Sequence, residues 1–132
     1  MPEVNYLAVL IAALSAFLLG GLWYSPLLFA RKHMALTGLS EDRLAGGSKA
    51  AIFGGAFLLS LVSAYVFAVF LGPNPGLKFA TAAGFAAGLA WVAAAFGINY
   101  LFERRPLGLW LINAGYHTIQ FTLYGAVLGA MG

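Results

Sequence analysis

The sequence predicts an all-α, polytopic membrane protein whose four transmembrane helices form two tight antiparallel hairpins in one bundle. Of the 132 residues, 62% are hydrophobic and 8% are charged, and the mean hydropathy is +0.90. An ordinary soluble domain carries about one quarter charged residues. Four apolar runs, at about 4–26, 50–71, 77–102 and 107–131, are each long enough to cross a bilayer, which takes about 20 residues. The length predicts a single domain over residues 1–132.

The composition also excludes several kinds of chemistry. The chain has no cysteine, so it has no disulfide, thiolate metal site or cysteine nucleophile. The net charge of +3 comes from loop residues, which argues against nucleic-acid binding. The carboxylates lie outside the apolar runs or at their ends: Glu3, Glu41, Asp42 and Glu103. We therefore expect neither a metal nor a cofactor.

The first run, 4–26, combines a smooth face with a distinctive end. Small residues recur every fourth position and allow another backbone to approach closely: Ala8, Ala12, Ala16 and Gly20. Ser15 lies near mid-depth. Pro26 should kink or stop the helix. Trp23 and Tyr24 are aromatics of the interfacial type, which serve either as an anchor or as a gate.

The segment 30–49 is predicted to be a cytoplasmic loop at the membrane surface. Within it, Ser40 is a plausible N-cap of a short helix that Gly46 and Gly47 would end. The second run, 50–71, carries Ser60 and Ser63 near its middle. The turn at 72–76, with its glycines and prolines, predicts that the second and third helices are antiparallel neighbours.

The third run, 77–102, has another small-residue face and ends in polar residues. Ala80, Gly84 and Gly88 form the face. Trp91 falls near mid-depth, where it either fills the core or walls a cavity. Asn99 and Tyr100 should lie in the same leaflet as Trp23 and Tyr24 and share the interface or gate role. The short connection at 103–106 predicts a second tight hairpin, and Pro106 suits the first position of the next helix.

The last run, 107–131, holds the strongest functional signal. Asn113, His117, Gln120 and Tyr124 are spaced by four, three and four residues, so they form one stripe on a helix. Such groups are costly to leave unpaired at membrane depth, so the stripe should face protein or water. Candidate cavity or ligand-binding residues are therefore this stripe, its neighbours and the mid-depth side chains of the other helices: Trp110, Asn113, Tyr116, His117, Gln120, Tyr124, Trp91, Ser15, Ser60 and Ser63.

The distribution of basic residues predicts the topology. Residues 30–49 and 103–106 fall on one side and hold all but one of the basic residues: Arg31, Lys32, Arg43, Lys49, Arg104 and Arg105, against Lys78. By the positive-inside rule, the two basic loops face the cytoplasm and both termini face outward. We expect the chain to lie in the cytoplasmic (inner) membrane and to self-associate through a small-residue face of the first or third helix.

Two stretches connect this chain to a known group of proteins. Residues 20–29 form one signature, and residues 100–105 with 109–117 form the other. They resemble the signatures of the small bacterial and fungal membrane proteins grouped as domain of unknown function seventeen sixty-one. The resemblance implies a four-helix membrane protein and supplies no activity. The ends of the first and third runs also share Gly-x-x-Tyr, at Gly21–Tyr24 and Gly97–Tyr100, which a duplicated hairpin or common interface composition would explain.

Three functions remain open on these observations. The first is a small transporter, channel or membrane-embedded binding protein that works as a homo-oligomer on an unknown small ligand. The second is a structural or assembly subunit whose polar stripe only holds helices together. The third is an intramembrane enzyme with His117 as general base, which the lack of a carboxylate dyad or nucleophile–base pair disfavours. A cavity that reaches His117 would favour the first, and dry side-chain pairing the second.

Overall fold

The computed structural model describes residues 4–38 and 49–132, and every regular element in them is helical. The elements in chain order are α1 (Tyr6–Trp23), α2 (Ala30–Thr37), α4 (Lys49–Leu71), α5 (Leu77–Ala87), the π-helix η1 (Gly88–Ala93), α6 (Ala94–Glu103) and α7 (Leu107–Met131). Because α5, η1 and α6 are continuous, residues 77–103 are called the rod below.

Three of these helices are long and apolar enough to cross a membrane, which marks the chain as a membrane protein. Within the described residues they are Tyr6–Trp23, Ala50–Leu71 and Leu77–Glu103. The fourth expected span, α7, is 25 residues long but is not among them. Its stripe of amide, imidazole and phenol groups lowers its hydropathy, so composition alone does not identify it as a span.

The first helix ends at Trp23, three residues before the end expected at residue 26. The N–H of Tyr24 donates to the carbonyl of Gly20 at 3.0 Å, and both the N–H and the Oγ of Ser25 donate to Leu22 O, at 3.1 and 2.6 Å. The chain therefore turns before it reaches Pro26, which is exposed in the turn. At the other end, the side chain of Asn5 caps the helix by accepting from the N–H of Ala8.

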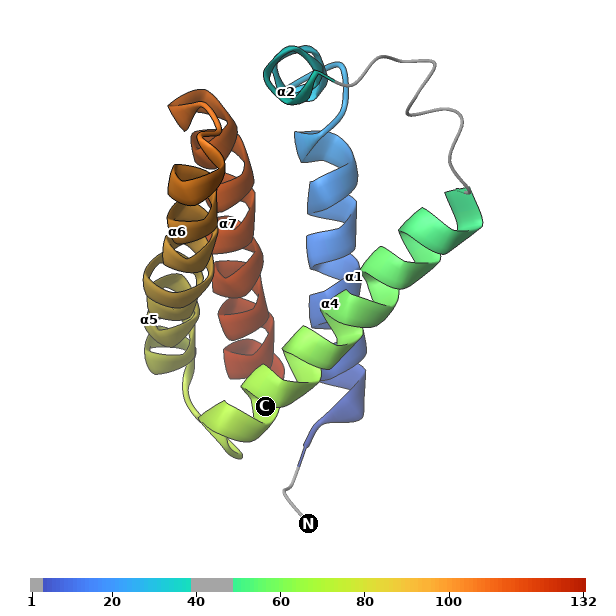
Figure 1. Ribbon diagram of the computed structural model, residues 1–132. Coiled ribbons are helices and arrows are strands. Elements are labelled where there is room, and N and C mark those ends of the chain that lie inside the picture. The colour runs from blue at the N-terminus through green and yellow to red at the C-terminus, as the bar shows by residue number, and fades with distance from the viewer. Residues whose placement is uncertain (1–3, 39–48) are drawn as a thin grey trace.

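The segment expected as a loop at 30–49 begins with the helix α2. It stops at Gly38, whose φ of 76° suits a residue without a Cβ. The short helix expected to start at Ser40 lies outside the described residues. In Figure 1, α2 is seen almost end-on while α1 and α7 run along the page, so it lies across the end of the bundle.

The rod and α7 form the tight hairpin that the short connection predicts. Glycines on both partners bring the backbones into contact. A Cβ added at Gly84 would overlap the carbonyl oxygen of Phe121, and one at Gly125 would overlap that of Ala80. The small-residue face of the rod is therefore used inside the chain. Because α7 covers this face, the self-association expected from the sequence would need another surface, and it stays a prediction.

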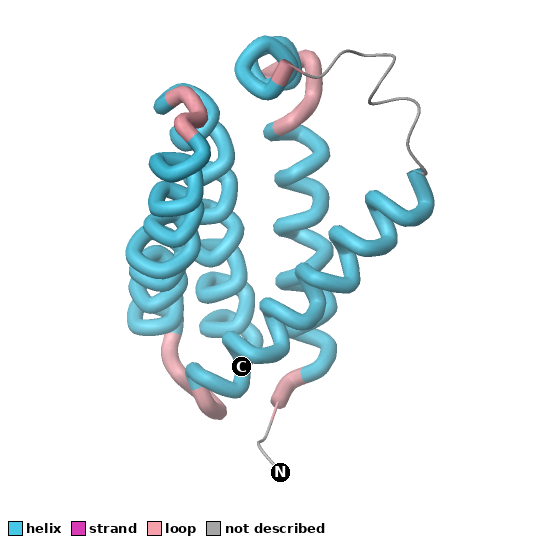
Figure 2. Tube along the Cα trace, in the orientation of Figure 1, coloured by secondary structure: helices cyan, strands magenta, loops and turns pink. Residues whose placement is uncertain are grey.

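The expected hairpin between the second and third helices is not tight. From the turn at residues 72–76, α4 diverges from the rod and crosses α1 (Figures 1 and 2). Phe70, two residues before this turn, contacts Trp91 in the middle of the rod, and their ring centroids are 6.0 Å apart. Asn74 in the turn has a φ of 49°, and Gly72 and Gly76 also have positive φ, so the turn redirects the chain.

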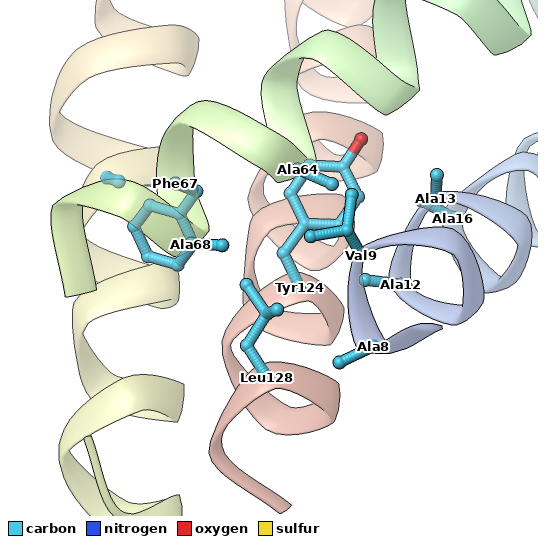
Figure 3. Close-up of a cluster of buried hydrophobic side chains, with 11 residues drawn as sticks. Ala8, Val9, Ala12, Ala13, Ala16, Ala64, Phe67, Ala68, Tyr124 and Leu128 are labelled. Atoms are coloured by element: carbon cyan, nitrogen blue, oxygen red, sulfur yellow. The ribbon is translucent and has the colours of Figure 1, made fainter. Parts of the chain in front are cut away.

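The core lies where α1, α4 and α7 meet. Tyr124 and Leu128 of α7 pack against Val9 of α1 and Ala64 of α4 (Figure 3). The small-residue face of α1 lines this core, because Ala8, Ala12 and Ala16 are fully buried. This face is therefore also used for packing within the chain.

Charge separates the two ends of the bundle. Arg31 and Lys32 lie on α2, and Arg104 and Arg105 lie in the connection at the same end (Figure 1). Arg105 Nε is 2.9 Å from Glu103 Oε1. Lys78 lies at the opposite end, next to the turn at 72–76.

Candidate functional site

The polar stripe of α7 faces the bundle interior around its middle. Gln120 is 6% exposed and Tyr124 is fully buried, and His117 is half-buried one turn before them. α7 presents these side chains inward because the rod and α1 pack on either side of it. The inward direction expected from the four-three-four spacing is what the structure shows.

Three residues of the stripe and one serine of α4 form a continuous chain of hydrogen bonds. His117 Nδ1 is 2.6 Å from Gln120 Oε1, and Gln120 Nε2 donates to Tyr124 OH at 2.6 Å. The Tyr124 hydroxyl is 2.6 Å from Ser60 Oγ, which in turn donates to the carbonyl of Ala13 at 3.4 Å. The chain therefore links α7, α4 and α1 through their most buried polar groups.

A cavity of about 330 Å³ lies beside this chain. Four helices supply its wall: Phe17 of α1, Ser60 and Ser63 of α4, Val92 of η1, and His117 and Gln120 of α7. It exists because α4 diverges from the rod at this level. Ser63 makes no side-chain hydrogen bond within the described residues, so its hydroxyl is free for a molecule in the cavity.

Asn113, the remaining member of the stripe, belongs to a second polar cluster near the basic end. Tyr24 OH donates to Asn113 Oδ1 at 2.6 Å, and Asn113 Nδ2 donates to Tyr100 OH at 2.8 Å. Burial raises the pKa of the Tyr24 hydroxyl, which therefore keeps the proton that it donates. A single amide thus holds the ends of α1 and the rod together. We call these three residues the Asn113 clamp.

Aromatic rings fill the space between the clamp and the cavity. The ring centroids of Tyr24 and Tyr116 are 5.6 Å apart, and those of Tyr116 and His117 are 4.9 Å apart. Phe96 of α6 stacks on the His117 ring at 4.9 Å with an interplanar angle of 11°. Tyr116 OH also donates to the carbonyl of Ala16 at 3.0 Å. Tyr116 and His117 also line the cavity, so these rings connect it to the clamp.

Two tryptophans brace the same end. Trp23 Nε1 donates to the carbonyl of Ile112 at 2.9 Å, and Trp110 Nε1 donates to the carbonyl of Ala93 at 2.8 Å. Ala93 is the last residue of the π-helix η1, a geometry that is frequent at functional sites. Each indole fixes α7 against a neighbouring helix, so both tryptophans position the polar residues without lining the cavity.

Most of the clamp and the bracing residues fall in the two stretches that resemble a known family. The family profile described as "Protein of unknown function (DUF1761)" matches residues 7–129. The chain belongs to this family. Comparison with curated proteins and with solved structures finds no significant match. The family's first stretch supplies Trp23 and Tyr24, and its second supplies Tyr100, Asn113 and His117.

Five of the residues expected at the cavity do not line it: Trp91, Ser15, Trp110, Asn113 and Tyr124. Trp91 is 63% exposed, so it does not fill the core, and it lines an open groove with Asn99 instead of the cavity beside His117. Ser15 Oγ donates to the carbonyl of Ala12 at 2.8 Å and packs within its own helix. Asn99 and Pro26 are exposed at the basic end. Helices that are apolar on every side give no sequence signal for the direction of one residue, which explains the error at Trp91.

Sequence reasoning missed the apolar part of the site. Phe17, Val92 and Phe121 wall the cavity, and Phe96 stacks on His117. One signal was present: Phe96 is four residues before Tyr100 and so shares its helix face, with ring centroids 5.7 Å apart. Among the described residues, no group of three or more His, Cys, Asp or Glu side chains could hold a metal ion.

Proposed function

We propose that this protein is a membrane-embedded binding protein or transporter for a small, mostly apolar molecule that occupies the cavity beside His117. The observation that carries this proposal is the cavity of about 330 Å³ where Ser60, Ser63, His117 and Gln120 meet apolar walls. Ligand sites in proteins are typically apolar cavities with a few well-placed polar groups, and this volume lies at their small end.

The proposal takes α7 to be the fourth transmembrane helix. With 25 residues and a rise of 1.5 Å per residue, α7 can span a hydrocarbon core of about 30 Å. It runs antiparallel to the rod in direct backbone contact, so a rod that crosses the bilayer takes α7 with it. α1, α4 and the rod shield its polar stripe from lipid.

We further propose an inner-membrane location with cytoplasmic basic loops and outward termini. The support is that Arg31, Lys32, Arg104 and Arg105 share one end of the bundle. Fusions of alkaline phosphatase and of green fluorescent protein to the C-terminus test the orientation. Phosphatase activity without fluorescence is the expected result, and the reverse pattern would overturn the topology.

The ligand enters from the bilayer in this proposal. Ala56 and Leu59 of α4 and Val92 of η1 line the cavity, and α4 diverges from the rod (Figure 1). At the basic end, the Asn113 clamp and the rings beneath it act as the closed gate. Transport through the membrane would then need the clamp to open, or a second copy of the chain to complete the path. For this reason the proposal includes a homo-oligomer.

A structural role is the second candidate, and one observation favours it. Among the described residues, no buried side-chain nitrogen or oxygen lacks a hydrogen-bond partner. Such full pairing is what a purely structural role requires. Each interhelical polar contact would then contribute about 0.6 kcal/mol on average to holding the helices together.

Thiol accessibility separates the two candidates, because the chain has no native cysteine. Ser63→Cys places a thiol on the cavity wall, and Ser15→Cys places one at a similar depth outside the cavity. In membrane vesicles, we expect N-ethylmaleimide to modify Cys at position 63 at least about tenfold faster, because thiolate formation needs water or a polar cavity. Equal, slow modification of both variants would favour the structural role.

A further inference from the structure

One histidine ring nitrogen in the bundle interior has no hydrogen-bond partner among residues 4–38 and 49–132. The hydrogen bonds of the stripe use His117 Nδ1, both ends of the Gln120 amide, the Tyr124 hydroxyl and Ser60 Oγ. His117 Nε2 takes part in none of them. Since no buried side-chain nitrogen or oxygen lacks a partner among the described residues, Nε2 is accessible, and His117 lines the cavity.

The direction of the hydrogen-bond chain determines which ring nitrogen carries the hydrogen. Gln120 Nε2 donates to Tyr124 OH, so Gln120 Oε1 is the atom that faces His117. A carbonyl oxygen only accepts, so His117 Nδ1 carries the hydrogen. In the neutral ring, Nε2 then keeps its lone pair and acts as an acceptor. The cavity therefore presents an acceptor to its contents.

The rest of the wall determines the charge of a suitable partner. Phe17, Val92 and Phe121 are apolar, and no carboxylate of the described residues lines the cavity. A buried ammonium group would lack a counter-ion there and would be strongly disfavoured. A neutral O–H group satisfies Nε2 without bringing charge into the bilayer.

We propose that the cavity binds a small apolar molecule through a single hydroxyl group, an alcohol or a phenol, which donates to His117 Nε2. This inference rests on the proposed function and names the chemical class of its ligand. Ser63 supplies a second polar contact for the same hydroxyl oxygen, and the phenyl and aliphatic walls hold the apolar body. Because the cavity lies between α4 and η1, such a molecule reaches it from the lipid phase.

A matched pair of probes tests the donor requirement. 4-Propylphenol and propylbenzene differ by one hydroxyl, and their binding to the full chain in nanodiscs is compared after correction for partitioning into lipid. We expect the phenol to bind about fivefold more tightly, the effect of one neutral hydrogen bond. His117→Phe should remove this preference and keep propylbenzene binding, whereas the control Ser15→Ala should keep both.

The outcomes separate this inference from the proposed function. If both probes bind equally well and the cavity-filling variant Ser63→Phe abolishes their binding, the hydroxyl requirement is overturned. The binding site itself would then remain in place. Binding of neither probe would overturn the proposed function itself.

Nitrogen NMR gives a readout that leaves every residue of the cavity unchanged. The chain has two histidines, so His33→Gln identifies the signals of His117 in ¹⁵N-histidine-labelled protein. We expect a protonated Nδ1 and an unprotonated Nε2, and a shift of the Nε2 signal on addition of 4-propylphenol but not propylbenzene. A proton on Nε2 in the free protein, or an Nε2 signal that the phenol leaves unchanged, would overturn the inference.

Discussion

The rod is joined to a neighbouring helix at each of its ends, yet the two joints give opposite results. At the basic end, residues 104–106 connect it to α7, and the two helices touch along their backbones. At the other end, residues 72–76 connect it to α4, which crosses away toward α1 (Figure 1). Both connections are short. The length of a turn therefore does not decide whether the helices that it joins will pack.

The difference lies in which faces carry the small residues. Gly84 and Gly88 of the rod meet Phe121 and Thr118 of α7, where an added Cβ would clash. A Cβ added at Gly54 or Gly55 of α4 would have no neighbouring atom within 4 Å. One pair of helices is closed by backbone contact, and the other remains open enough to leave a cavity. The cavity is thus a consequence of where close packing is absent.

The largest expected effect comes from a bulky residue in the closed pair. Gly84→Leu would drive a side chain into the backbone carbonyl of Phe121, and backbone cannot move aside as a flexible side chain can. We expect it to lower the free energy of unfolding by about 3 kcal/mol or more, measured by denaturant titration in mild detergent. The matched variant Gly54→Leu should leave stability nearly unchanged. Equal losses would show that the two pairs do not differ in packing.

The next effect concerns the polar chain that bridges the open side. Tyr124→Phe removes the hydroxyl that accepts from Gln120 and contacts Ser60, so two buried groups lose a partner. We expect a loss of about 1–3 kcal/mol in the same titration. Tyr65→Phe, on the outer part of α4, is the control, because its hydroxyl has no hydrogen bond within the described residues. A stable Tyr124→Phe variant would mean that the chain does not hold α4 in place.

The Asn113 clamp should give smaller and similar losses on its two sides. Tyr24→Phe and Tyr100→Phe each remove one hydrogen bond to Asn113, worth about 1 kcal/mol. Each should lose its effect in the background of Asn113→Leu, which a double-mutant cycle measures. Additive losses in that cycle would contradict a shared clamp.

The clamp shows how far the sequence could predict the site. The spacing predicted that Asn113 shares a face with His117 and Gln120, because helical periodicity is local. It could not show that Tyr24, 89 residues away, bonds to the same amide as Tyr100. The shared Gly-x-x-Tyr pattern hinted at equivalent roles, and the two tyrosines do bond to one residue. Their glycines differ, since Gly97 meets Trp110 whereas Gly21 meets nothing within 4 Å.

The fold was predictable to a similar extent. Hydropathy located the apolar helices, because length and composition suffice for that. The small-residue faces predicted close packing but not its partner, and pattern cannot distinguish contact within a chain from contact between chains. The direction of Trp91 and the divergence of α4 depend on long-range packing, which leaves no periodic signal in helices that are apolar on every side.

The smallest expected effect is a pH dependence at the clamp's outer edge. His33 of α2 packs edge-on against Tyr24, with ring centroids 5.1 Å apart, and burial lowers its pKa below the usual 6.5. Because the folded pKa lies below the unfolded one, His33 favours folding above about pH 6.5, and this contribution is lost as the pH falls through the folded pKa. The side chain is partly exposed, so solvent screening keeps the effect small. The melting temperature should therefore fall slightly between pH 7 and pH 5 in the wild type and fall less in His33→Gln. Identical pH profiles for the two proteins would show that protonation of His33 does not affect the stability of the fold.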